Sequence, residues 1–303
     1  MANNMEHTGM KHRSVPTASI DYDMYIPRKW GGDYKEIGDE AQDLEQYVLS
    51  DDKFTHYLIT SEKGMGKTLL VYHIAFKHGI PIIMLSCSSA TKEGDLLGKT
   101  QIDTEGSYYQ LGVLPIAVEL ANRNGKCILY LDELNALDEQ MQKILNSLLD
   151  ERRCVVANGK EYRVNDGCKL QAIATTNPLG LGTNTIIEDL KSRFPFGREW
   201  IYNSSHFNVF EWSMPENYKT LFIRFAEDLR SLRIKDSMSY SLSTRDMKAI
   251  NTAFEIAHKK YGDDFDSILK TVLNTCVINH KFDTTEERDS VRSLAYDVFG
   301  VKL

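Results

Sequence analysis

The sequence predicts an α/β fold, in which an open parallel sheet with helices on its faces is followed by a smaller all-helical domain. Between about residues 54 and 203, short apolar runs alternate with helix-like segments, which is the pattern of repeated strand–helix–strand units. Beyond residue 205, only helical periodicity remains. Because single hydrophobic cores stop growing at about 250 to 300 residues, a chain of 303 residues has room for a main domain and a companion.

The strands of the sheet are expected where apolar runs are bounded by polar or turn residues. They are 55–60, 81–86, 127–131, 169–176 and 198–203. A helix beginning at Lys67 follows the first strand, and another covers 138–150, since apolar residues recur there three and four positions apart. Asn158-Gly159 lies between two β-like runs in 152–165 and predicts a hairpin before the fourth strand.

The C-terminal part is expected to consist of helices with one apolar face each. They cover about 215–232, 244–260, 265–279 and 284–298. Polar residues and a proline interrupt the pattern over 203–215, which places the domain boundary there. The expected organisation is a flexible segment over 1–21, an α/β domain over 22–205 and a helical lid domain over 206–303.

Composition and charge predict a compact cytoplasmic protein. Hydrophobic residues make up 42% and charged residues 26%, and no apolar stretch reaches the roughly 18 residues that cross a bilayer. The N-terminal stretch lacks the apolar block of a secretory signal, so we expect no membrane association. Five cysteines without a C-x-x-C pair are expected to be reduced thiols. The net charge of -7 argues against a broadly basic surface for nucleic acid but permits a local basic groove.

The stretch SEKGMGKT begins at Ser61 and matches the phosphate-binding pattern G-x-x-x-x-G-K-[ST] at every required position except the first. Backbone N–H groups of a glycine-rich turn that opens a helix converge on an anion, and Gly64 and Gly66 permit such a backbone. Lys67 would reach the β and γ phosphates, and the Thr68 hydroxyl would bind Mg²⁺. The alternative is an ordinary surface loop.

A second motif is ILYLDE, an apolar strand that ends in Asp132 and Glu133. Such an acid pair suits a metal-dependent hydrolase, in which Asp132 holds Mg²⁺ through water and Glu133 polarises the attacking water. Asn177 follows the next predicted strand, at the edge where open α/β sheets bind ligands, and would orient that water. Considered one at a time, the two acids could be helix caps and Asn177 could be a turn residue. Because they follow the glycine-rich loop in this order, together they indicate triphosphate hydrolysis.

Two arginines complete the candidate set. Arg193 ends a short helix in DLKSRF, and Arg245 lies in the first turn of a helix in SLSTRDM, where Ser243 or Thr244 is the expected cap. An arginine neutralises charge on a transferring phosphoryl group, and it couples hydrolysis to assembly when a neighbouring subunit supplies it. The alternative for each arginine is a surface salt bridge.

The motifs SEKGMGKT, ILYLDELN, IATTNP, LKSRF and STR resemble, in sequence and order, those of AAA+ ATPases of the MoxR type, and especially the CbbQ/NorQ-like and GvpN-like members. The resemblance covers about residues 22 to 255. It implies a P-loop NTPase core with a five-stranded parallel sheet, a β-hairpin insert over 92–119 and a helical lid. The insert and the 152–165 hairpin would face the pore of a ring, which makes Tyr108, Tyr109, Arg152 and Arg153 candidates for contact with a client. The alternative for the two tyrosines is that they pack the hairpin.

The resemblance also implies a nucleotide-binding set in the loop and near the adenine. Its members are Lys63, Gly64, Met65, Gly66, Lys67, Thr68, Leu69, Tyr25 and Ile26. Thr68 and Asp132 would hold Mg²⁺, and Glu133 would be the catalytic base. Asn177 would be the sensor 1 residue.

The two arginines take the remaining family roles. Arg193 would be an arginine finger acting in trans, and Arg245 would be the sensor 2 residue. The chain departs from the family pattern at two places. Ser61 replaces the usual glycine, which is expected to affect nucleotide affinity, and YSL, 240–242, replaces the usual small residues before the sensor 2 arginine, which is expected to affect lid geometry.

The implied function is an ATPase that converts ATP and water to ADP and phosphate with Mg²⁺ in a homo-oligomeric, hexameric ring. Hydrolysis would remodel or activate a protein client, for which a von Willebrand factor A domain protein is a candidate. One alternative is a motor or loader on nucleic acid, with Arg152, Arg153, Lys160 and Arg163 following the phosphate backbone. Another is a nucleotide-dependent scaffold with little turnover. The sequence leaves the choice between ATP and GTP open.

Overall fold

The computed structural model describes residues 16–28, 34–104, 106–177, 184–201, 204–235 and 237–303. The chain divides into two compact units. The first consists of Met1–Gly32, Ala41–Thr60 and Thr68–Glu199, and the second of Asp33–Glu40, Ser61–Lys67 and Trp200–Leu303. Most of the segment 1–21, which was expected to be flexible, lies outside the described residues. Within the described ranges, no helix is both long and apolar enough to cross a membrane.

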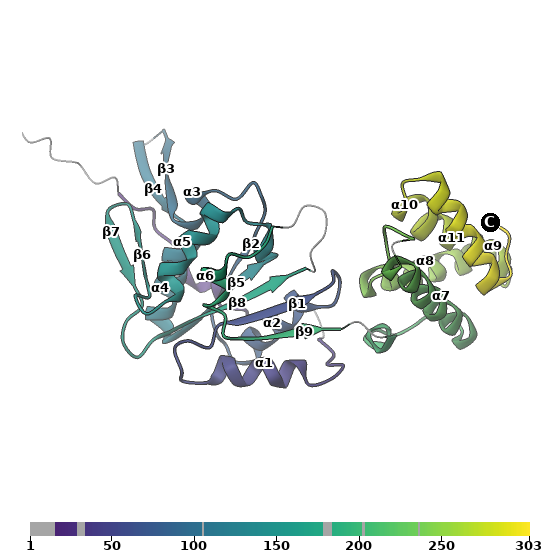
Figure 1. Cartoon of the computed structure of the whole chain (residues 1–303), viewed down its shortest axis with the longest axis horizontal. Helices are drawn as coiled ribbons and strands as arrows, with labels where there is room; N and C mark the ends of the chain where they lie inside the picture. The colour runs from purple at the N-terminus through teal and green to yellow at the C-terminus, as the bar shows by residue number, and fades with distance from the viewer. Residues whose placement is uncertain (1–15, 29–33, 105, 178–183, 202–203, 236) are drawn as a thin grey trace, which may run out of the picture. The chain divides into compact units, whose positions relative to one another are not determined.

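The structure confirms the predicted α/β fold, with a five-stranded sheet in the order β2-β5-β8-β1-β9 (Figure 1). The pairs β1–β8, β5–β8 and β2–β5 are parallel, and their register sets Ser86 opposite Asp132 and Thr60 opposite Thr176. The carboxyl ends of these strands therefore lie at one edge of the sheet, where open α/β sheets bind ligands. The strands are β1 (Tyr57–Ser61), β2 (Ile82–Ser86), β5 (Lys126–Asp132), β8 (Lys169–Thr176) and β9 (Phe196–Trp200).

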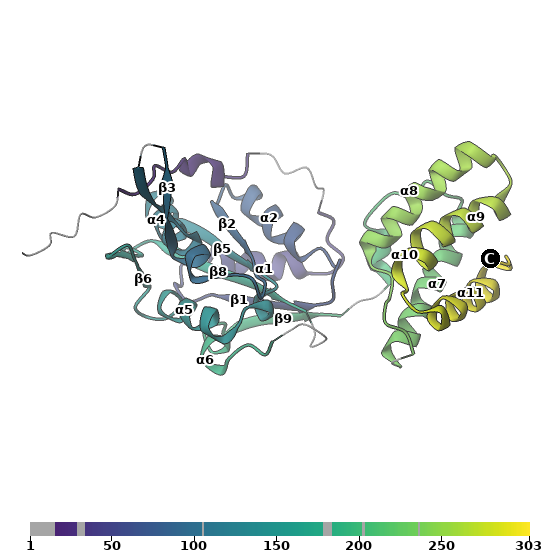
Figure 2. The ribbon, with the colours of Figure 1, turned by 90° about the horizontal axis from the view of Figure 1, so that it is seen from above.

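Helices cover both faces of the sheet, and α2 and α5 lie on opposite sides of it (Figures 1 and 2). Side chains alternate along β5, so Cys127, Leu129 and Leu131 join the core that contains α4 and α5. Tyr130 points to the other face, where its ring lies 6.5 Å from that of Tyr72 on α2. The helical elements here are η1 (Tyr22–Tyr25), α1 (Glu40–Leu49), α2 (Lys67–Lys77), α3 (Glu93–Leu96), α4 (Val113–Asn124), η2 (Leu134–Ala136), α5 (Glu139–Leu149) and α6 (Glu188–Lys191).

Two antiparallel hairpins belong to the same unit. One pairs β3 (Gly98–Asp103) with β4 (Gly106–Leu111), and the other pairs β6 (Cys154–Ala157) with β7 (Lys160–Arg163). In the second turn, Asn158 and Gly159 have φ angles of 50° and 71°, the positive values that the Asn-Gly pair predicts. Tyr109 of β4 exchanges backbone hydrogen bonds with the N-terminal segment, since its N–H donates to Pro16 and its carbonyl accepts from Ala18.

The C-terminal part consists of helices that share a separate hydrophobic core, in which Phe222, Phe225 and Phe254 are buried. The predicted helix over 265–279 is not one regular helix, because the chain makes a π turn over Asn274–Ile278. In that turn, the Asn279 N–H donates to the Asn274 carbonyl, five residues earlier. The elements are η3 (Ser204–Asn208), α7 (Glu216–Ile234), α8 (Thr244–Tyr261), α9 (Phe265–Leu273), η4 (Asn274–Ile278), α10 (Asn279–Lys281) and α11 (Thr285–Phe299).

Candidate active site

The predicted phosphate-binding loop joins β1 to α2. Gly64 and Gly66 adopt φ angles of 79° and 87°, which glycine reaches at little cost, so the residue type is needed at both positions. Lys67 opens α2 and is buried, and its Nζ donates to the Ser61 carbonyl at 2.7 Å, the Ser61 Oγ at 3.0 Å and the Glu62 carbonyl at 3.0 Å. The ammonium is thus held by oxygen atoms of its own loop. Among the other predicted nucleotide-binding residues, Met65 is buried, Lys63 is exposed, and Leu69 lies in the first turn of α2.

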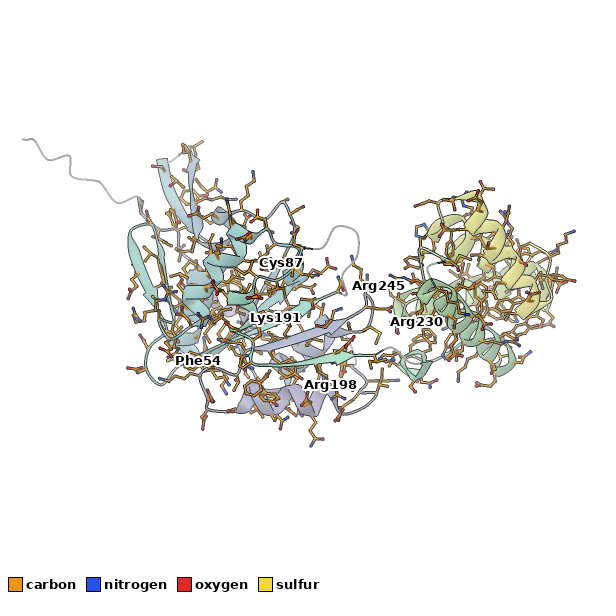
Figure 3. All side chains as sticks on the ribbon, in the orientation of Figure 1. Phe54, Cys87, Lys191, Arg198, Arg230 and Arg245 are labelled. Atoms are coloured by element: carbon orange, nitrogen blue, oxygen red, sulfur yellow. The ribbon has the colours of Figure 1, made fainter. Side chains whose placement is uncertain are left out.

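Residues of the helical part contact this loop within the second unit. A Cβ atom on Gly64 would lie 2.7 Å from the Ser243 Cβ, so only glycine fits there. Ser243 caps α8, accepting from the Asp246 N–H, which confirms the first of the two predicted caps. Arg245, the predicted sensor 2 residue, follows in the first turn of α8 and is exposed (Figure 3). Arg230, also labelled in Figure 3, donates from Nη1 to Glu62 Oε1 at 2.8 Å.

A hydrogen-bonded cluster lies at the carboxyl ends of β5 and β8. Asp132 Oδ1 accepts from the Thr175 Oγ1 at 2.6 Å and from the Tyr130 hydroxyl at 2.9 Å. The same Tyr130 hydroxyl lies 3.0 Å from Thr68 Oγ1 in the first turn of α2. The two predicted metal-binding residues, Thr68 and Asp132, are therefore joined through one tyrosine hydroxyl. Hydroxyl and carboxylate oxygens are the donors that Mg²⁺ prefers, so this pair fits the predicted ion.

Glu133, the predicted catalytic base, has a φ angle of 57°, in the left-handed region that costs a non-glycine residue about 1 to 3 kcal/mol. Its backbone N–H donates to Thr175 Oγ1 at 3.0 Å, which fixes this conformation. Its side chain accepts at Oε1 from Asn177 Nδ2 at 3.1 Å. The structure therefore brings together Glu133 and Asn177, the predicted base and sensor, in an arrangement that a neighbouring strand holds in place.

The charges of Asp132 and Glu133 produce a negative potential that affects the pKa of a neighbouring cysteine thiol. Cys87, labelled in Figure 3, follows β2, and its N–H donates to the Asp132 carbonyl at 2.8 Å. Burial, together with the negative charges of Asp132 and Glu133, raises the pKa of the Cys87 thiol to about 12. The thiol consequently stays protonated at neutral pH. The same potential favours a cation at the strand ends.

Arg193 lies just after α6, and its backbone N–H donates to the Leu190 carbonyl. Its Nε is buried and has no hydrogen-bond partner among the residues that the structure describes. Hydrogen bonds from Arg152 lower the pKa of Asp150, at the C-terminal end of α5, and the charge of Arg193 contributes to the same shift. The charge of Arg193 thus acts near the end of α5.

Tyr25 lines a cavity of about 570 Å³ beside the edge strand β2, and Ile26 is the residue that follows η1. Tyr72 of α2 and Met84 of β2 line the same cavity. The cavity is lined by apolar residues and also by the polar side chains of Asp95, Lys99 and Gln110. The prediction that Tyr25 and Ile26 lie near an adenine stays a prediction.

Sequence reasoning missed Tyr130 and Thr175, which complete the cluster around Asp132. A signal for Tyr130 was available: side chains two apart on a strand point to the same face, so Tyr130 accompanies Asp132. Thr175 lies in β8, which is buried at every residue, and a buried hydroxyl needs a partner. Neither pattern identifies the hydrogen-bond partner. Tyr130 contacts Thr68, 62 residues away in the chain, and Thr175 contacts Asp132, 43 residues away.

Comparison with known proteins places this geometry in a family. The model of the AAA domain of the dynein-related subfamily matches residues 56–194. The CbbQ protein of Hydrogenophilus thermoluteolus is 27% identical over 159 residues, 52% of this chain and 55% of CbbQ. The denitrification regulatory protein NirQ of Stutzerimonas stutzeri is 31% identical over 123 residues, 40% of this chain and 41% of NirQ. The chain thus matches about half the length of these two relatives.

NorQ of Paracoccus denitrificans is similar over a longer range, at 24% identity over 300 residues that cover 93% of this chain and 96% of NorQ. The sheet, the loop and the acid pair define the class of AAA+ P-loop proteins. Within that class, the chain belongs to the MoxR type, together with CbbQ, NirQ and NorQ.

Proposed function

We propose that this protein is an ATPase that binds ATP with Mg²⁺ and hydrolyses it to ADP and phosphate. The observation that carries the proposal is the contact between Glu133 and Asn177 beside the Asp132 cluster. A carboxylate that is fixed next to an amide, at the edge of the sheet where ligands bind, is suited to orient a water molecule and take its proton.

Each residue of the site has a part in this proposal. The backbone of the loop with Gly64 and Gly66 binds the phosphates, and Lys67 leaves its loop oxygens to pair with them. Thr68 and Asp132 would hold Mg²⁺, which neutralises charge on the phosphates when bound. Glu133 accepts the proton of the attacking water, and Asn177 keeps Glu133 and that water in line.

We also propose that the protein forms a homo-oligomeric ring in which Arg193 acts on the nucleotide bound by a neighbouring subunit. The family resemblance implies six subunits. Its buried Nε without a hydrogen-bond partner in the described ranges supports a group that is completed elsewhere. Arg245 is the proposed sensor 2 residue, supported by the contact of the neighbouring Ser243 with the loop.

The proposed client is a protein, which hydrolysis remodels or activates, and a von Willebrand factor A domain protein is the candidate that the resemblance offers. The charges of the β6–β7 hairpin support a protein over a nucleic acid. Arg152 pairs with Asp150, Arg163 with Glu161, and Lys160 with Glu119. Arg153 is buried and donates to the Cys168 carbonyl at 2.6 Å. Cations that are neutralised by acids of the same chain attract a phosphate backbone weakly.

The test compares the purified wild-type protein with Glu133→Gln and Lys67→Ala. Wild type should bind ATP saturably with Mg²⁺ and release phosphate. Glu133→Gln should bind ATP with nearly unchanged affinity but release phosphate about 10² to 10⁴ times more slowly, because the amide cannot take a proton. Lys67→Ala should lose most binding.

Glu139→Gln is the matched control, because Glu139 is an exposed acid of α5 that pairs with Lys143. Equal turnover of wild type and Glu133→Gln would refute the catalytic role and favour a scaffold that binds nucleotide without rapid hydrolysis. Equal binding by Lys67→Ala would refute the site itself.

A further inference from the structure

We propose that Tyr130 is a positioning residue for the Mg²⁺ of this site, which rests on the proposed ATPase function. Its hydroxyl lies between Thr68 Oγ1, at 3.0 Å, and Asp132 Oδ1, at 2.9 Å. These are the two side chains proposed to hold the ion. Tyr130 would not touch the ion or the nucleotide; it would act through the two residues that do.

The position of Tyr130 follows from the strand and the helix that flank it. Tyr130 and Asp132 are two residues apart on β5 and so point to the same face. Thr68 and Tyr72 are four apart on α2 and so lie on one side of that helix. Tyr130 is fully buried, and its ring meets that of Tyr72 edge to face at 6.5 Å. The hydroxyl is therefore fixed by packing as well as by its hydrogen bonds.

The directions of the hydrogen bonds follow from the available protons. A tyrosine hydroxyl carries one proton, so Tyr130 can donate one hydrogen bond. The Asp132 carboxylate only accepts, so Tyr130 donates to it. The contact between Thr68 and Tyr130 can then form only if Thr68 donates to the tyrosine oxygen. On the other side, Thr175 donates to Asp132 and accepts from the Glu133 N–H.

This order of donors prepares both oxygens for a cation. The Thr68 proton points to Tyr130, which leaves the lone pairs of Thr68 Oγ1 for the ion. Tyr130 and Thr175 both donate to Oδ1 of Asp132, which leaves Oδ2 for a water molecule on the ion. Residues that orient metal-binding groups in this way change metal affinity about 10- to 100-fold when they are removed.

The test is Tyr130→Phe, which removes the hydroxyl and keeps the ring. We measure binding of a fluorescent ATP analogue at increasing Mg²⁺ and, separately, in EDTA. The Mg²⁺ concentration for half-maximal enhancement of binding should rise about tenfold, and affinity in EDTA should stay within about twofold of wild type. Tyr296→Phe is the matched control and should leave both values unchanged, because it removes an exposed tyrosine hydroxyl on α11.

Thr175→Val provides a second variant of nearly equal volume, should Tyr130→Phe fold poorly. It removes the other donor to Asp132 Oδ1 and should raise the half-saturating Mg²⁺ in the same direction. A wild-type Mg²⁺ response of Tyr130→Phe, or an equal loss of binding with and without Mg²⁺, would overturn the positioning role. If the wild-type protein itself binds no nucleotide, the proposed function falls and this inference with it; a normal wild type with a normal Tyr130→Phe overturns the inference alone.

Discussion

Ser61 stands where the phosphate-binding pattern has glycine, and its side chain takes part in holding Lys67. Lys67 Nζ donates to Ser61 Oγ at 3.0 Å and to two backbone carbonyls of the loop. A triphosphate must compete with these three oxygens for the ammonium. The departure from the pattern therefore bears on affinity, because an extra acceptor stabilises the loop without nucleotide.

We predict that Ser61→Ala and Ser61→Gly each bind ATP more tightly than wild type. A net hydrogen bond to a charged group is worth about 1.5 to 3 kcal/mol, but two acceptors remain, so a three- to tenfold decrease of Kd is expected. Titration of a fluorescent ATP analogue in EDTA measures the effect without the contribution of Mg²⁺. Weaker binding by both variants would mean that the hydroxyl supports the nucleotide-bound loop instead.

Three elements meet at His56, at the end of the sheet opposite the candidate site. His56 precedes β1, is 3% exposed, and accepts at Nδ1 from the Ala172 N–H of β8 at 3.0 Å. Burial lowers the pKa of His56 to about 4, and a hydrogen bond with the backbone of Leu149, at the end of α5, opposes part of this shift. The neutral ring thus joins β1, β8 and α5, and protonation would break the bond from Ala172.

We predict a loss of stability in acid that depends on this junction. The pKa in the folded state, about 4, lies below the ordinary value of 6.5, so the stabilisation is complete above pH 6.5 and is lost as the pH falls towards 4. A pKa lower by about 2.5 corresponds to roughly 3 kcal/mol of unfolding free energy. Urea unfolding of wild type and His56→Asn at several pH values between 7 and 4 measures it.

The variant should be less stable at pH 7 and should show a flatter pH dependence than wild type. His258→Asn, at an exposed histidine of α8, should keep the wild-type slope. Parallel slopes for wild type and His56→Asn would show that other groups carry the acid sensitivity.

Four strands of the sheet were predictable because each is an apolar run of the right length, and the helices because apolar residues recur every three or four positions. The edge strand β9, FGREW, is mostly polar and covers Phe196–Trp200, two residues before the predicted start at 198. The phosphate-binding loop and Asp132 with Glu133 were predictable because the order of residue types is itself the chemistry. The hydrogen bond between Tyr130 and Thr68 was not predictable, because strand periodicity shows on which face of the sheet a side chain lies but not which helix covers that face. The π turn at Asn274–Ile278 also escaped, because one additional residue hardly alters the apolar period of a short helix.

At the scale of the whole molecule, the chain has two separate hydrophobic cores, one under the sheet and one among the C-terminal helices. The proposed loop residues Ser61–Lys67 belong to the unit with the helices, whereas Thr68, Asp132 and Glu133 belong to the unit with the sheet. Under the proposed function, the Arg193 of a neighbouring subunit acts on the nucleotide together with Asp132 and Glu133. Hydrolysis would then depend on assembly.

We predict that two inactive variants restore activity when they are mixed. Glu133→Gln keeps Arg193, and Arg193→Ala keeps Glu133, so a mixed ring contains interfaces with both groups intact. Random mixing in equal amounts should restore about a quarter of the wild-type rate per site, since half of the subunits have the base and half of their neighbours the arginine. Phosphate release after subunit exchange measures it. A mixture as inactive as its components would refute action in trans, as would full activity of Arg193→Ala alone.

The π turn before α10 has a consequence for the start of α8. Lys281 follows that turn and pairs with Asp246 at 2.6 Å, and Asp246 is the acid that completes the cap at Ser243, beside Arg245. Deleting one residue from Asn274–Ile278 would restore an ordinary helical step and rotate everything after it by about 100°. Lys281 would then face away from its partner. The additional residue of the π turn thereby helps to fix the start of α8, where Arg245, the arginine proposed to sense the nucleotide, lies.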